Sequence, residues 1–460
     1  MGFFKAYDMR GTFGVDFDLD TVYKVGLSLP QVVTPGVAAP RWLIAHDCRT
    51  TGAEVSAALE RGLRDAGASV SDLGLASTPM VYFFTAEDGY DGSVMVTASH
   101  NPPMDNGLKV SKSTALPVGY ADGLDEVERL VSEDGRRATA EGSSASRVPR
   151  PVPGALERYL AWQREHGGTP PRSLRYAVDC SNGMASLFAH ELFPGAVVVN
   201  DVMDGRFPAH SPNPLKDEAR EQVAALVRER GLDCGVIFDG DADRAMFVDE
   251  RGEFVQPDYL VPVVARATRR FMSSGERGEK VIHDVRTSRG AVEALREDGF
   301  EPVMVPVGHA FAKPALRRVG AICGGELAGH YYFSEFAGCD SGALAALRIL
   351  GEIAASKERG ISFSAMMAPI SGRYANSGER NFTVKDKDAA IRSVMECIAA
   401  EFPEEVSRSE MDGVRVEFAD GWVNVRKSNT EPLLRLIAEF DTRGKLDERV
   451  AKLVRAIENA

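Results

Sequence analysis

Ser99 follows a short apolar segment in VMVTASHNPPMDNGLKV, which begins at Val94. A serine at the end of a strand is exposed and held by the backbone, which suits a nucleophile or a carrier of a phosphoryl group. An isolated serine of this kind is more often part of a Ser/Asn/Pro turn with a solvated hydroxyl. The polar run around it and the N-G-x-K motif with Lys109 favour a chemical role. His100 is the adjacent residue, and the sequence has no G-x-S-x-G elbow or P-loop motif, so neither a hydrolase triad nor a P-loop NTPase is indicated.

Three aspartates alternate in FDGDADR, directly after a second strand-like segment: Asp239, Asp241 and Asp243. Carboxylates at this spacing can converge on one divalent cation when the loop curls, and ligation by oxygen alone suits Mg²⁺ or Ca²⁺. An EF-hand is excluded because Arg244 stands where that loop needs its turn glycine, and because the flanking segments are strand-like. The alternative is an acidic solvated turn. The pattern favours Mg²⁺ with open positions for phosphate oxygens.

Two further loops carry groups that could bind a phosphorylated sugar. Glu326 and His330 lie in GGELAGHYYF, where a carboxylate can accept hydrogen bonds from sugar hydroxyls and an imidazole can move a proton. A glycine-rich structural turn explains this loop equally well, and His309 in VGHAF has a similarly plain alternative as a satisfied histidine. The loop RKSNTEP, from Arg426 to Pro432, offers a guanidinium, hydroxyls and backbone N–H groups. These suit a phosphate site or an ordinary polar turn.

The strands that must position these loops follow a repeated pattern. Three times, a short apolar strand ends in an aspartate, followed by a polar loop and a helix-like segment. A second strand follows roughly 40 to 60 residues later and ends in one of the loops above, with helical segments such as AEVSAALERGLRDAG and GAVEALREDG in between. This spacing predicts right-handed parallel units, with ligands at the carboxyl ends of the strands. The three strand-ending aspartates are Asp47, Asp179 and Asp284.

The C-terminal part has a different pattern. FTVKDKDAAIRSVMECIAAEF is typical of a strand and a helix, VRVEFADGWVNV and PLLRLIAEF are strands on either side of RKSNTEP, and LDERVAKLVRAIENA is a closing amphipathic helix. We therefore predict three tandem related mixed α/β domains and a smaller C-terminal α+β domain. Turn residues cluster near the expected boundaries. The predicted domains span residues 1–152 with the serine loop, 153–256 with the aspartate loop, 257–371 with the Glu326 loop and 372–460 with the Arg426 loop.

Composition limits the classes of function. The 460 residues carry 54 Lys+Arg and 67 Asp+Glu, a net charge of −13, and no basic run that nucleic-acid or membrane-surface binding would use. The six cysteines are scattered without a C-x-x-C pair, so neither zinc nor a disulfide framework is indicated. With no membrane-length apolar stretch or targeting segment, we expect a soluble cytoplasmic protein, either a monomer or a small homo-oligomer.

In this order, the loops closely resemble those of the α-D-phosphohexomutase family, and specifically its phosphomannomutase or phosphomannomutase/phosphoglucomutase branch. The resemblance covers essentially the whole chain from FKAYDMRGTFG onward. It implies a central cleft between the four domains, sugar phosphates as partners, Mg²⁺ as cofactor and a hexose 1,6-bisphosphate as activator. It implies that Ser99 is a phosphoserine and a metal ligand together with Asp239, Asp241 and Asp243. The further residues at matching positions are Tyr7, Arg10, Lys109, Arg244, Arg286, His309, Glu326, Ala328, His330, Arg426, Ser428, Asn429 and Thr430.

The resemblance predicts the interconversion of mannose 1-phosphate and mannose 6-phosphate, and of the corresponding glucose phosphates, through phospho-Ser99 and a bound 1,6-bisphosphate. Arg10, Lys109 and His330 are the candidate acid/base groups, with Lys109 first because it lies on the serine loop. Ala328 departs from the serine usual in this branch, so the preferred sugar stays open. The alternatives are a phosphoglucosamine mutase, a glucose-preferring phosphoglucomutase and a non-catalytic sugar-phosphate sensor.

Overall fold

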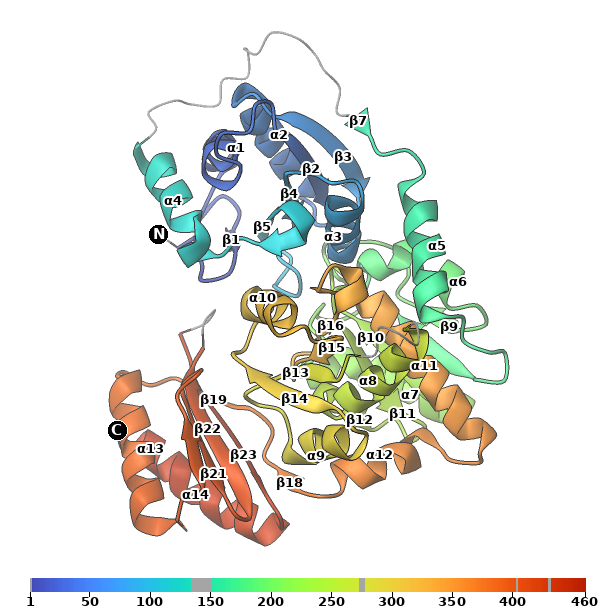
Figure 1. Cartoon of the computed structure of the whole chain (residues 1–460), viewed down its shortest axis with the longest axis vertical. Coiled ribbons are helices and arrows are strands. Elements are labelled where there is room, and N and C mark those ends of the chain that lie inside the picture. Colours follow the sequence, from blue (N-terminus) through green and yellow to red (C-terminus); the bar gives the residue numbers. More distant parts are fainter. Residues whose placement is uncertain (1, 134–149, 273–277, 403, 429–431) are drawn as a thin grey trace.

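The computed structural model describes residues 2–133, 150–272, 278–402, 404–428 and 432–460, and it contains four β-sheets (Figure 1). The first sheet has the order β1-β5-β4-β2-β3-β7, with β6 on β5. The second is β12-β11-β10-β8-β9, the third β14-β13-β15-β16-β17, and the fourth β18-β23-β22-β21-β20, with β19 on β23. The predicted fold class, three related α/β units followed by a smaller α+β unit, is confirmed.

The strands of the first sheet are β1 (Met9–Thr12), β2 (Arg41–His46), β3 (Ser69–Leu75), β4 (Gly92–Val96), β5 (Asp105–Lys112), β6 (Leu116–Pro117) and β7 (Arg150–Pro151). Those of the second are β8 (Tyr176–Asp179), β9 (Val197–Val199), β10 (Cys234–Phe238), β11 (Ala245–Asp249) and β12 (Phe254–Val255). Those of the third are β13 (Lys280–Asp284), β14 (Glu301–Val305), β15 (Cys323–Gly325), β16 (Tyr331–Phe333) and β17 (Cys339–Asp340).

The first three sheets repeat one topology. The aspartate-ending strand of each lies between two parallel neighbours: β2 between β3 and β4, β8 between β9 and β10, and β13 between β14 and β15. The strand that follows the functional loop then turns back in antiparallel direction, as β5, β11 and β16 do. The predicted parallel pairs β2/β4, β8/β10 and β13/β15 are therefore confirmed. Their loops all leave from the carboxyl ends of parallel strands, where open α/β sheets place ligands.

Side-chain alternation along the strands gives each sheet two packed faces. Trp42 and Ile44 of β2 face a core shared with the helices α1, α2 and α4, whereas Leu43 and Ala45 face a larger core common to the first three sheets. The second and third sheets likewise pack one face on their own helix, α7 or α10, and the other on the common core. This common core includes α3, α5, α8 and α11, and it fixes the three sheets relative to one another.

The α-helices of these units lie between the strands along the chain. Two glycines allow the first two helices to touch, because a Cβ at Gly62 would lie 2.1 Å from the Tyr23 carbonyl oxygen and one at Gly26 would lie 2.5 Å from that of Leu59. The helices are α1 (Leu19–Val33), α2 (Gly52–Asp65), α3 (Thr78–Glu87), α4 (Leu124–Glu133), α5 (Ala155–Gly167), α6 (Ala189–Leu192), α7 (Asp217–Arg230), α8 (Val261–Phe271), α9 (Arg289–Glu297), α10 (His309–Val319), α11 (Gly342–Glu358) and α12 (Phe363–Ser371).

The fourth sheet is antiparallel and has its own core beneath two helices. In Figure 1 it forms the red unit beside the third sheet. Its predicted helices and the strands predicted around RKSNTEP are found, whereas the strand predicted from Phe382 onward lies earlier in the chain and ends at that residue. The strands of this unit are β18 (Ala375–Asn376), β19 (Arg380–Phe382), β20 (Ser407–Ser409), β21 (Val414–Phe418), β22 (Gly421–Lys427) and β23 (Leu434–Phe440), with α13 (Lys387–Glu401) and α14 (Arg443–Glu458).

A buried polar junction attaches this fourth unit to the third. The fully buried Glu439 accepts hydrogen bonds from the Arg289 backbone N–H at 2.7 Å and from Trp422 Nε1 at 3.0 Å. The Arg415 guanidinium lies over the Trp422 ring at 3.8 Å. Because a buried charge is costly unless it is hydrogen-bonded, these contacts define one specific docking geometry.

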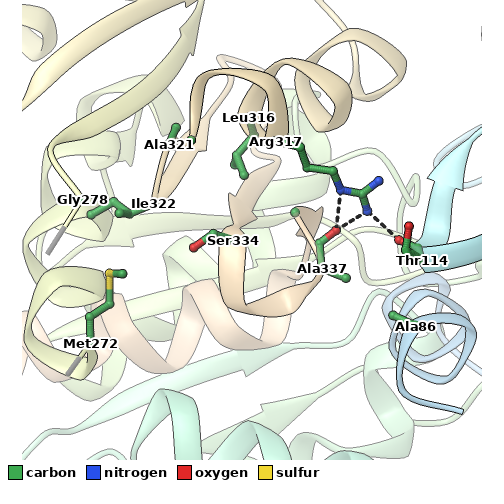
Figure 2. Close-up of a pocket in the computed structure, with 12 residues that line it drawn as sticks. Ala86, Thr114, Met272, Gly278, Leu316, Arg317, Ala321, Ile322, Ser334 and Ala337 are labelled. Carbon is green, nitrogen blue, oxygen red and sulfur yellow. Dashed lines mark hydrogen bonds between the residues drawn. The ribbon is translucent and has the colours of Figure 1, made fainter. Parts of the chain in front are cut away.

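A cavity of about 550 Å³ lies between the first and third units (Figure 2). Arg317 of α10 lines it and donates to the carbonyl oxygens of Thr114 and Ala337. None of the predicted site residues lines this cavity, so it is a feature of the junction between units. The six cysteines are free thiols. Within the described ranges, we find no helix with the length and apolar character needed to cross a membrane.

Candidate active site

Ser99 lies just beyond the end of β4, in a conformation that only its surroundings can maintain. Its φ angle is 51°, in the left-handed region that non-glycine residues rarely adopt, and its side chain is buried. Its Oγ donates to Asp239 Oδ2 at 3.0 Å, and its backbone N–H donates to Thr97 Oγ1 at 2.8 Å. The hydroxyl is therefore aimed at the first aspartate of the predicted metal loop.

Asp239, Asp241 and Asp243 converge in the turn between β10 and β11, as their spacing predicts. All three are buried, and one oxygen from each lies within 4.8 Å of the others. Among the described residues, Asp241 Oδ1 and Asp243 Oδ1 have no hydrogen-bond partner. Burial and the neighbouring carboxylates raise the pKa of Asp239 well above its ordinary value. Hard oxygen donors with unsatisfied lone pairs fit a divalent cation such as Mg²⁺.

Lys109 of β5 contributes a cation to this cluster from the first unit. Its Nζ lies 2.6 Å from Asp241 Oδ2 and 2.7 Å from Asp243 Oδ2. Burial disfavours its charged form, but the two carboxylates outweigh burial and raise the pKa of the ammonium. Thr78 at the start of α3 donates its hydroxyl to Asp241 Oδ2 at 2.5 Å. The aspartate loop of the second unit is thus clamped to the first.

Arg244, directly after the third aspartate, connects three loops. Its Nε lies 3.0 Å from Asp239 Oδ2 and 3.8 Å from Asp243 Oδ1, and its guanidinium donates to His100 Nδ1. Because this contact occupies Nδ1, the nitrogen that lies 3.3 Å from Ser99 Oγ is not a free base. This agrees with the sequence analysis, which indicated no hydrolase triad.

Arg10 on β1 contacts the serine loop. Its strand pairs with β5, and its guanidinium donates to Asn101 Oδ1 at 3.1 Å and pairs with Asp8 at 2.5 Å. The positive charge of Arg10 is also close enough to Asp241 and Asp243 to interact with both carboxylates electrostatically. Arg10 is therefore a third cation near the aspartates, together with Lys109 and Arg244.

The loop with Glu326 and His330 touches the aspartate loop directly. Arg244 and His330 form an isolated antiparallel β-bridge, and a tight turn places Ala328 between Glu326 and His330, whose backbones are joined by a 3.0 Å hydrogen bond. The Leu327 N–H donates to Asp284 Oδ2 at 3.1 Å, so the loop is anchored on the end of β13.

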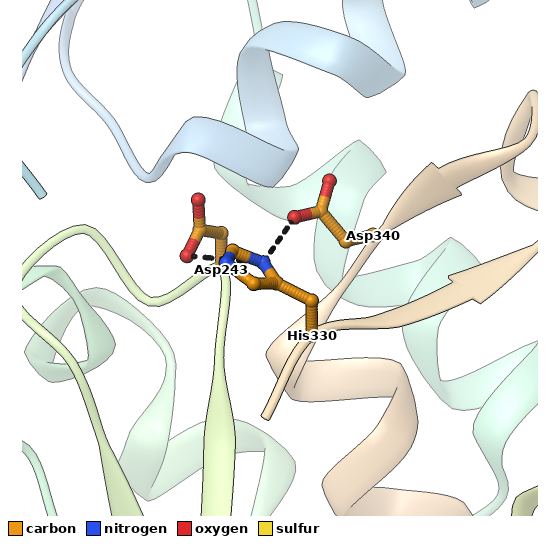
Figure 3. A group of neighbouring side chains, drawn as sticks. All are labelled: Asp243, His330 and Asp340. Atoms are coloured by element: carbon orange, nitrogen blue, oxygen red, sulfur yellow. Dashed lines mark hydrogen bonds and ion pairs between the residues drawn. The ribbon is translucent and has the colours of Figure 1, made fainter. Parts of the chain in front are cut away.

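Asp340 of β17 holds the His330 ring. His330 Nδ1 lies 2.6 Å from Asp340 Oδ2 and 3.7 Å from Asp243 Oδ1 (Figure 3). The other oxygen of Asp340 lies 2.8 Å from the fully buried Lys313 Nζ. These three groups, Asp243, His330 and Asp340, could also hold a metal ion, but the ammonium of Lys313 already balances Asp340. The aspartate triplet is the better cation site.

Arg286 follows β13 and reaches toward the fourth unit. Its Nη2 pairs with Asp284 Oδ2 at 2.7 Å and lies 3.8 Å from Glu326 Oε2, and its Nη1 lies 3.2 Å from Glu379 Oε2. Two arginines of the fourth sheet share the same carboxylate: Arg426 at 3.3 Å and Arg435 at 3.0 Å. Burial opposes the charged form of Glu379, but the three arginines lower the pKa of its carboxyl.

Tyr7 and His309 close the site between the first and third units. The Tyr7 hydroxyl donates to the Val307 carbonyl oxygen at 3.1 Å. A Cβ on Gly308 would lie 3.1 Å from the Tyr7 ring, and Gly308 has a φ of +116°, so both space and backbone favour glycine here. His309 begins α10, its ring centroid is 6.2 Å from that of His330, and burial lowers its pKa well below the ordinary value.

Short contacts connect most of the predicted site residues into one network from Ser99 to Arg426. Ser428 is described through its backbone N–H, which donates to the Leu433 carbonyl oxygen at 2.9 Å, whereas Asn429 and Thr430 lie outside the described residues. Sequence reasoning missed several charged residues of this network, including four in the third and fourth units. Arg435 lies within the predicted strand PLLRLIAEF, close to the Arg426 loop, which was a usable signal, whereas the others carry no local pattern. The four residues are Lys313, Asp340, Glu379 and Arg435.

These features define an enzyme class. It is a multi-unit α/β protein in which a buried serine contacts an acidic loop that could bind a metal, and in which several arginines converge at the fourth unit. Four successive family models match the chain, described as phosphoglucomutase/phosphomannomutase, alpha/beta/alpha domain I at residues 1–137, domain II at 161–252, domain III at 256–370 and C-terminal domain at 379–456. The chain belongs to the phosphoglucomutase/phosphomannomutase family, whose members are mutases and therefore isomerases.

Individual relatives agree with this assignment over nearly their full lengths. A phosphomannomutase of Escherichia coli is 34% identical over 452 residues, covering 95% of this chain and 94% of the relative. A phosphoglucomutase of Neisseria gonorrhoeae is 32% identical over 463 residues, covering 99% and 96%. The crystal structure of a phosphoglucomutase/phosphomannomutase family protein from Burkholderia thailandensis is similar with a TM-score of 0.82 at 30% identity, covering 100% of this chain and 97% of that one.

Proposed function

We propose that the chain interconverts mannose 1-phosphate and mannose 6-phosphate, and also the corresponding glucose phosphates, through a phosphorylated Ser99 and a hexose 1,6-bisphosphate. The observation that carries the proposal is the 3.0 Å contact between Ser99 Oγ and Asp239 in the aspartate loop. A phosphoryl group on Oγ would lie beside the three carboxylates, the natural place for a metal that binds phosphate oxygens. The names of the relatives support both sugars.

In the first half-reaction, a free sugar hydroxyl attacks the phosphorus of phospho-Ser99. The P–Oγ bond breaks and a new P–O bond forms to the sugar, while an acid/base group takes the hydroxyl proton and Ser99 Oγ ends as a protonated hydroxyl. The resulting bisphosphate turns around, and its other phosphoryl group passes to Ser99 Oγ as the released sugar oxygen regains a proton. Mg²⁺, held by Asp239, Asp241, Asp243 and an oxygen of phospho-Ser99, would neutralise charge on the transferring group. Arg244 and Lys109 add positive charge beside the same atoms.

Of the three candidate proton carriers, we favour His330. The position of Lys109 on the serine loop favours it from sequence, but its ammonium is held by two carboxylates, which suits charge neutralisation better than proton release. Arg10 is likewise paired, with Asp8. His330 has Nδ1 fixed by Asp340, so its other ring nitrogen is the one available to a sugar hydroxyl.

The phosphate that is not being transferred would bind where Arg286, Arg426 and Arg435 converge. Arg426 is buried, and its Nε has no hydrogen-bond partner among the described residues, so it has a donor to offer. Guanidinium groups recognise phosphate oxygens by charge-assisted, often paired hydrogen bonds. Ser428, Asn429 and Thr430 complete this site by resemblance to the family loop.

Replacing Ser99 with alanine tests the proposal. Ser99→Ala should show no mutase turnover with mannose 1-phosphate and the 1,6-bisphosphate activator, and the purified variant should lack the mass of the one phosphate that the parent protein carries. Ser113→Ala, an exposed serine of the same unit, is the matched control and should retain both properties. Normal turnover by Ser99→Ala would refute the phosphoserine.

A glucose preference is the second candidate, because one observation leaves the choice of sugar open. The turn between Glu326 and His330 presents the methyl group of Ala328, so a hydroxyl contact to the sugar is lacking at this position. Specificity constants for mannose, glucose and glucosamine phosphates measured side by side decide among a phosphomannomutase, a phosphoglucomutase and a phosphoglucosamine mutase. Binding of these sugars without turnover of any of them would instead identify a sensor.

A further inference from the structure

Arg49 makes contacts that the proposed chemistry has not used. It lies just after β2, and its side chain is buried with none of its surface exposed. Nε lies 3.2 Å from Asp47 Oδ2. The two terminal nitrogens donate to four backbone carbonyl oxygens of one loop, namely Ser99 at 2.9 Å, Asn101 at 2.8 Å, Pro102 at 2.7 Å and Asp105 at 2.8 Å.

Asp47 restrains the backbone N–H of Ser99 through Thr97. Its Oδ2 accepts from Thr97 Oγ1 at 2.5 Å, and Thr97 Oγ1 in turn accepts from the Ser99 N–H at 2.8 Å. Both backbone groups of Ser99 are therefore tied to the Asp47–Arg49 pair. A left-handed residue needs restraint of this kind, because L-residues other than glycine avoid that region.

The three repeated units anchor their functional loops with the same kind of hydrogen bond from a strand-ending aspartate. Asp47, Asp179 and Asp284 each accept a hydrogen bond from the backbone N–H two residues further on. In the second unit, Ser181 then donates to the Phe238 carbonyl oxygen at 2.6 Å, just before Asp239. In the third unit, Asp284 itself accepts from the Leu327 N–H. Each strand-ending aspartate thus anchors the functional loop that leaves the neighbouring parallel strand.

The second unit also covers Arg49. The Phe207 ring centroid lies 5.2 Å from the guanidinium carbon, and a Cβ on Gly205 would lie 2.5 Å from Arg49 Cα, so this loop packs tightly on the arginine. A Cβ on Gly240, beside the aspartates, would lie 2.5 Å from the Ser99 carbonyl oxygen. Arg49 is therefore enclosed between the serine loop and the second unit and has no route to a sugar phosphate.

We infer that Arg49 is a positioning residue for phosphoryl transfer: it holds the backbone of residues 99–105 so that Ser99 Oγ stays aligned with the aspartate loop. The inference rests on the proposed phosphoserine. It assigns Arg49 an effect on the chemical step and none on substrate affinity, because its terminal nitrogens donate to backbone carbonyls and its Nε pairs with Asp47. Misalignment of a reacting atom by about 1 Å lowers rates by about a hundredfold.

The experiment compares Arg49→Lys and Arg49→Ala with Arg41→Ala. Arg41 begins the same strand, and its guanidinium also donates to backbone carbonyl oxygens, those of Asp88 and Gly89, but outside the site. We expect kcat to fall about a hundredfold in both Arg49 variants, with KM for the sugar phosphate within about threefold of the parent. Arg41→Ala should keep kcat and KM.

Added guanidinium provides the readout that a general structural role would not move. At concentrations below those that unfold the parent, it should restore part of kcat to Arg49→Ala by refilling the donor site, whereas methylammonium should not. Unchanged kcat in both Arg49 variants, or an increase in KM that accounts for the loss, would overturn the inference. The inference would also be overturned by one combined result. In that result, Arg49→Lys keeps full activity, and the loss of kcat in Arg49→Ala matches its unfolded fraction and is not restored by guanidinium.

The inference and the proposed function fail in different ways. If Ser99→Ala keeps full turnover, the phosphoserine is wrong and the positioning role of Arg49 falls with it. If Ser99→Ala is inactive while the Arg49 variants match the parent, only the inference about Arg49 is overturned.

Discussion

Ser99 Oγ and Asp239 Oδ2 lie 3.0 Å apart, although the two residues are 140 positions apart in the chain and belong to different sheets. Each follows a strand of a parallel pair, and the core common to the first three sheets fixes those pairs relative to each other. A nucleophile and a metal-competent loop from separate units are thus brought into contact without a shared local sequence. The proposed Mg²⁺ would act beside this contact, where the aspartate oxygens gather.

Magnesium should stabilise the protein through the aspartate loop. Three buried carboxylates repel one another, so a divalent cation relieves their repulsion, and a ligand at a hundred times its Kd stabilises the folded state by about 2.7 kcal/mol. We expect Mg²⁺ to raise the thermal midpoint of the parent and a chelator to abolish mutase activity until Mg²⁺ is restored. Asp243→Asn should lose the thermal shift, whereas Asp217→Asn, a fully exposed carboxylate, should keep it. An activity that withstands the chelator would argue against the site.

The strands and loops that have a local sequence pattern could be predicted from the sequence. The apolar strands that end in aspartate predicted the parallel strand pairs. The polar loops after the second strand of each pair predicted Ser99 and Asp239 as site residues. The third parallel strand of each unit was missed, since β9 has only three residues and β3 reads SVSDLGL, with little apolar alternation. Glu379 and Asp340 could not be found because their significance arises from partners on other elements, which no local spacing records.

Arg426→Ala should weaken substrate binding. Arg426 is almost fully buried and lies beside Glu379 and Asp412, so its guanidinium is fixed before a ligand arrives. Loss of charge-assisted hydrogen bonds to phosphate costs about 1.5–3 kcal/mol, so KM should rise at least tenfold. Steady-state kinetics with mannose 1-phosphate measure this, and Arg408→Ala on an exposed ion pair of the same sheet is the control. An unchanged KM would remove this arginine from substrate binding.

Glu379→Gln should strengthen the binding of anions at the same place. In the parent, the Glu379 carboxylate is an internal anion shared by Arg286, Arg426 and Arg435, so an incoming phosphate competes with it. The glutamine keeps the shape and removes the charge. We expect inorganic phosphate to inhibit the variant at a severalfold lower concentration, while Glu405→Gln, on the exposed ion pair with Arg408, leaves inhibition unchanged. Weaker inhibition would instead show that the carboxylate is needed to organise the three arginines.

Asp258→Asn should flatten the dependence of stability on pH. Asp258 is fully buried beside the start of α9, where its Oδ2 accepts from the Ser288 N–H at 2.9 Å. Burial raises the pKa of its carboxyl to about 7 from an ordinary value of 3.8. Between these two values the folded state binds more protons than the unfolded state, so this group contributes most stability at low pH. That contribution is lost as pH rises toward 7, by at most about 1.4 kcal/mol per pH unit.

Urea denaturation at pH 5, 6, 7 and 8 measures this effect as the difference between parent and variant. All other groups titrate in both proteins, so subtracting the two curves isolates Asp258. The variant should gain stability relative to the parent as pH rises to about 7, and the difference should then stay constant, because the asparagine retains an acceptor for Ser288 without a buried charge. Asp125→Asn, an exposed carboxylate of α4, should follow the parent at every pH. Parallel curves for the parent and Asp258→Asn would mean that this carboxyl titrates normally in the folded protein.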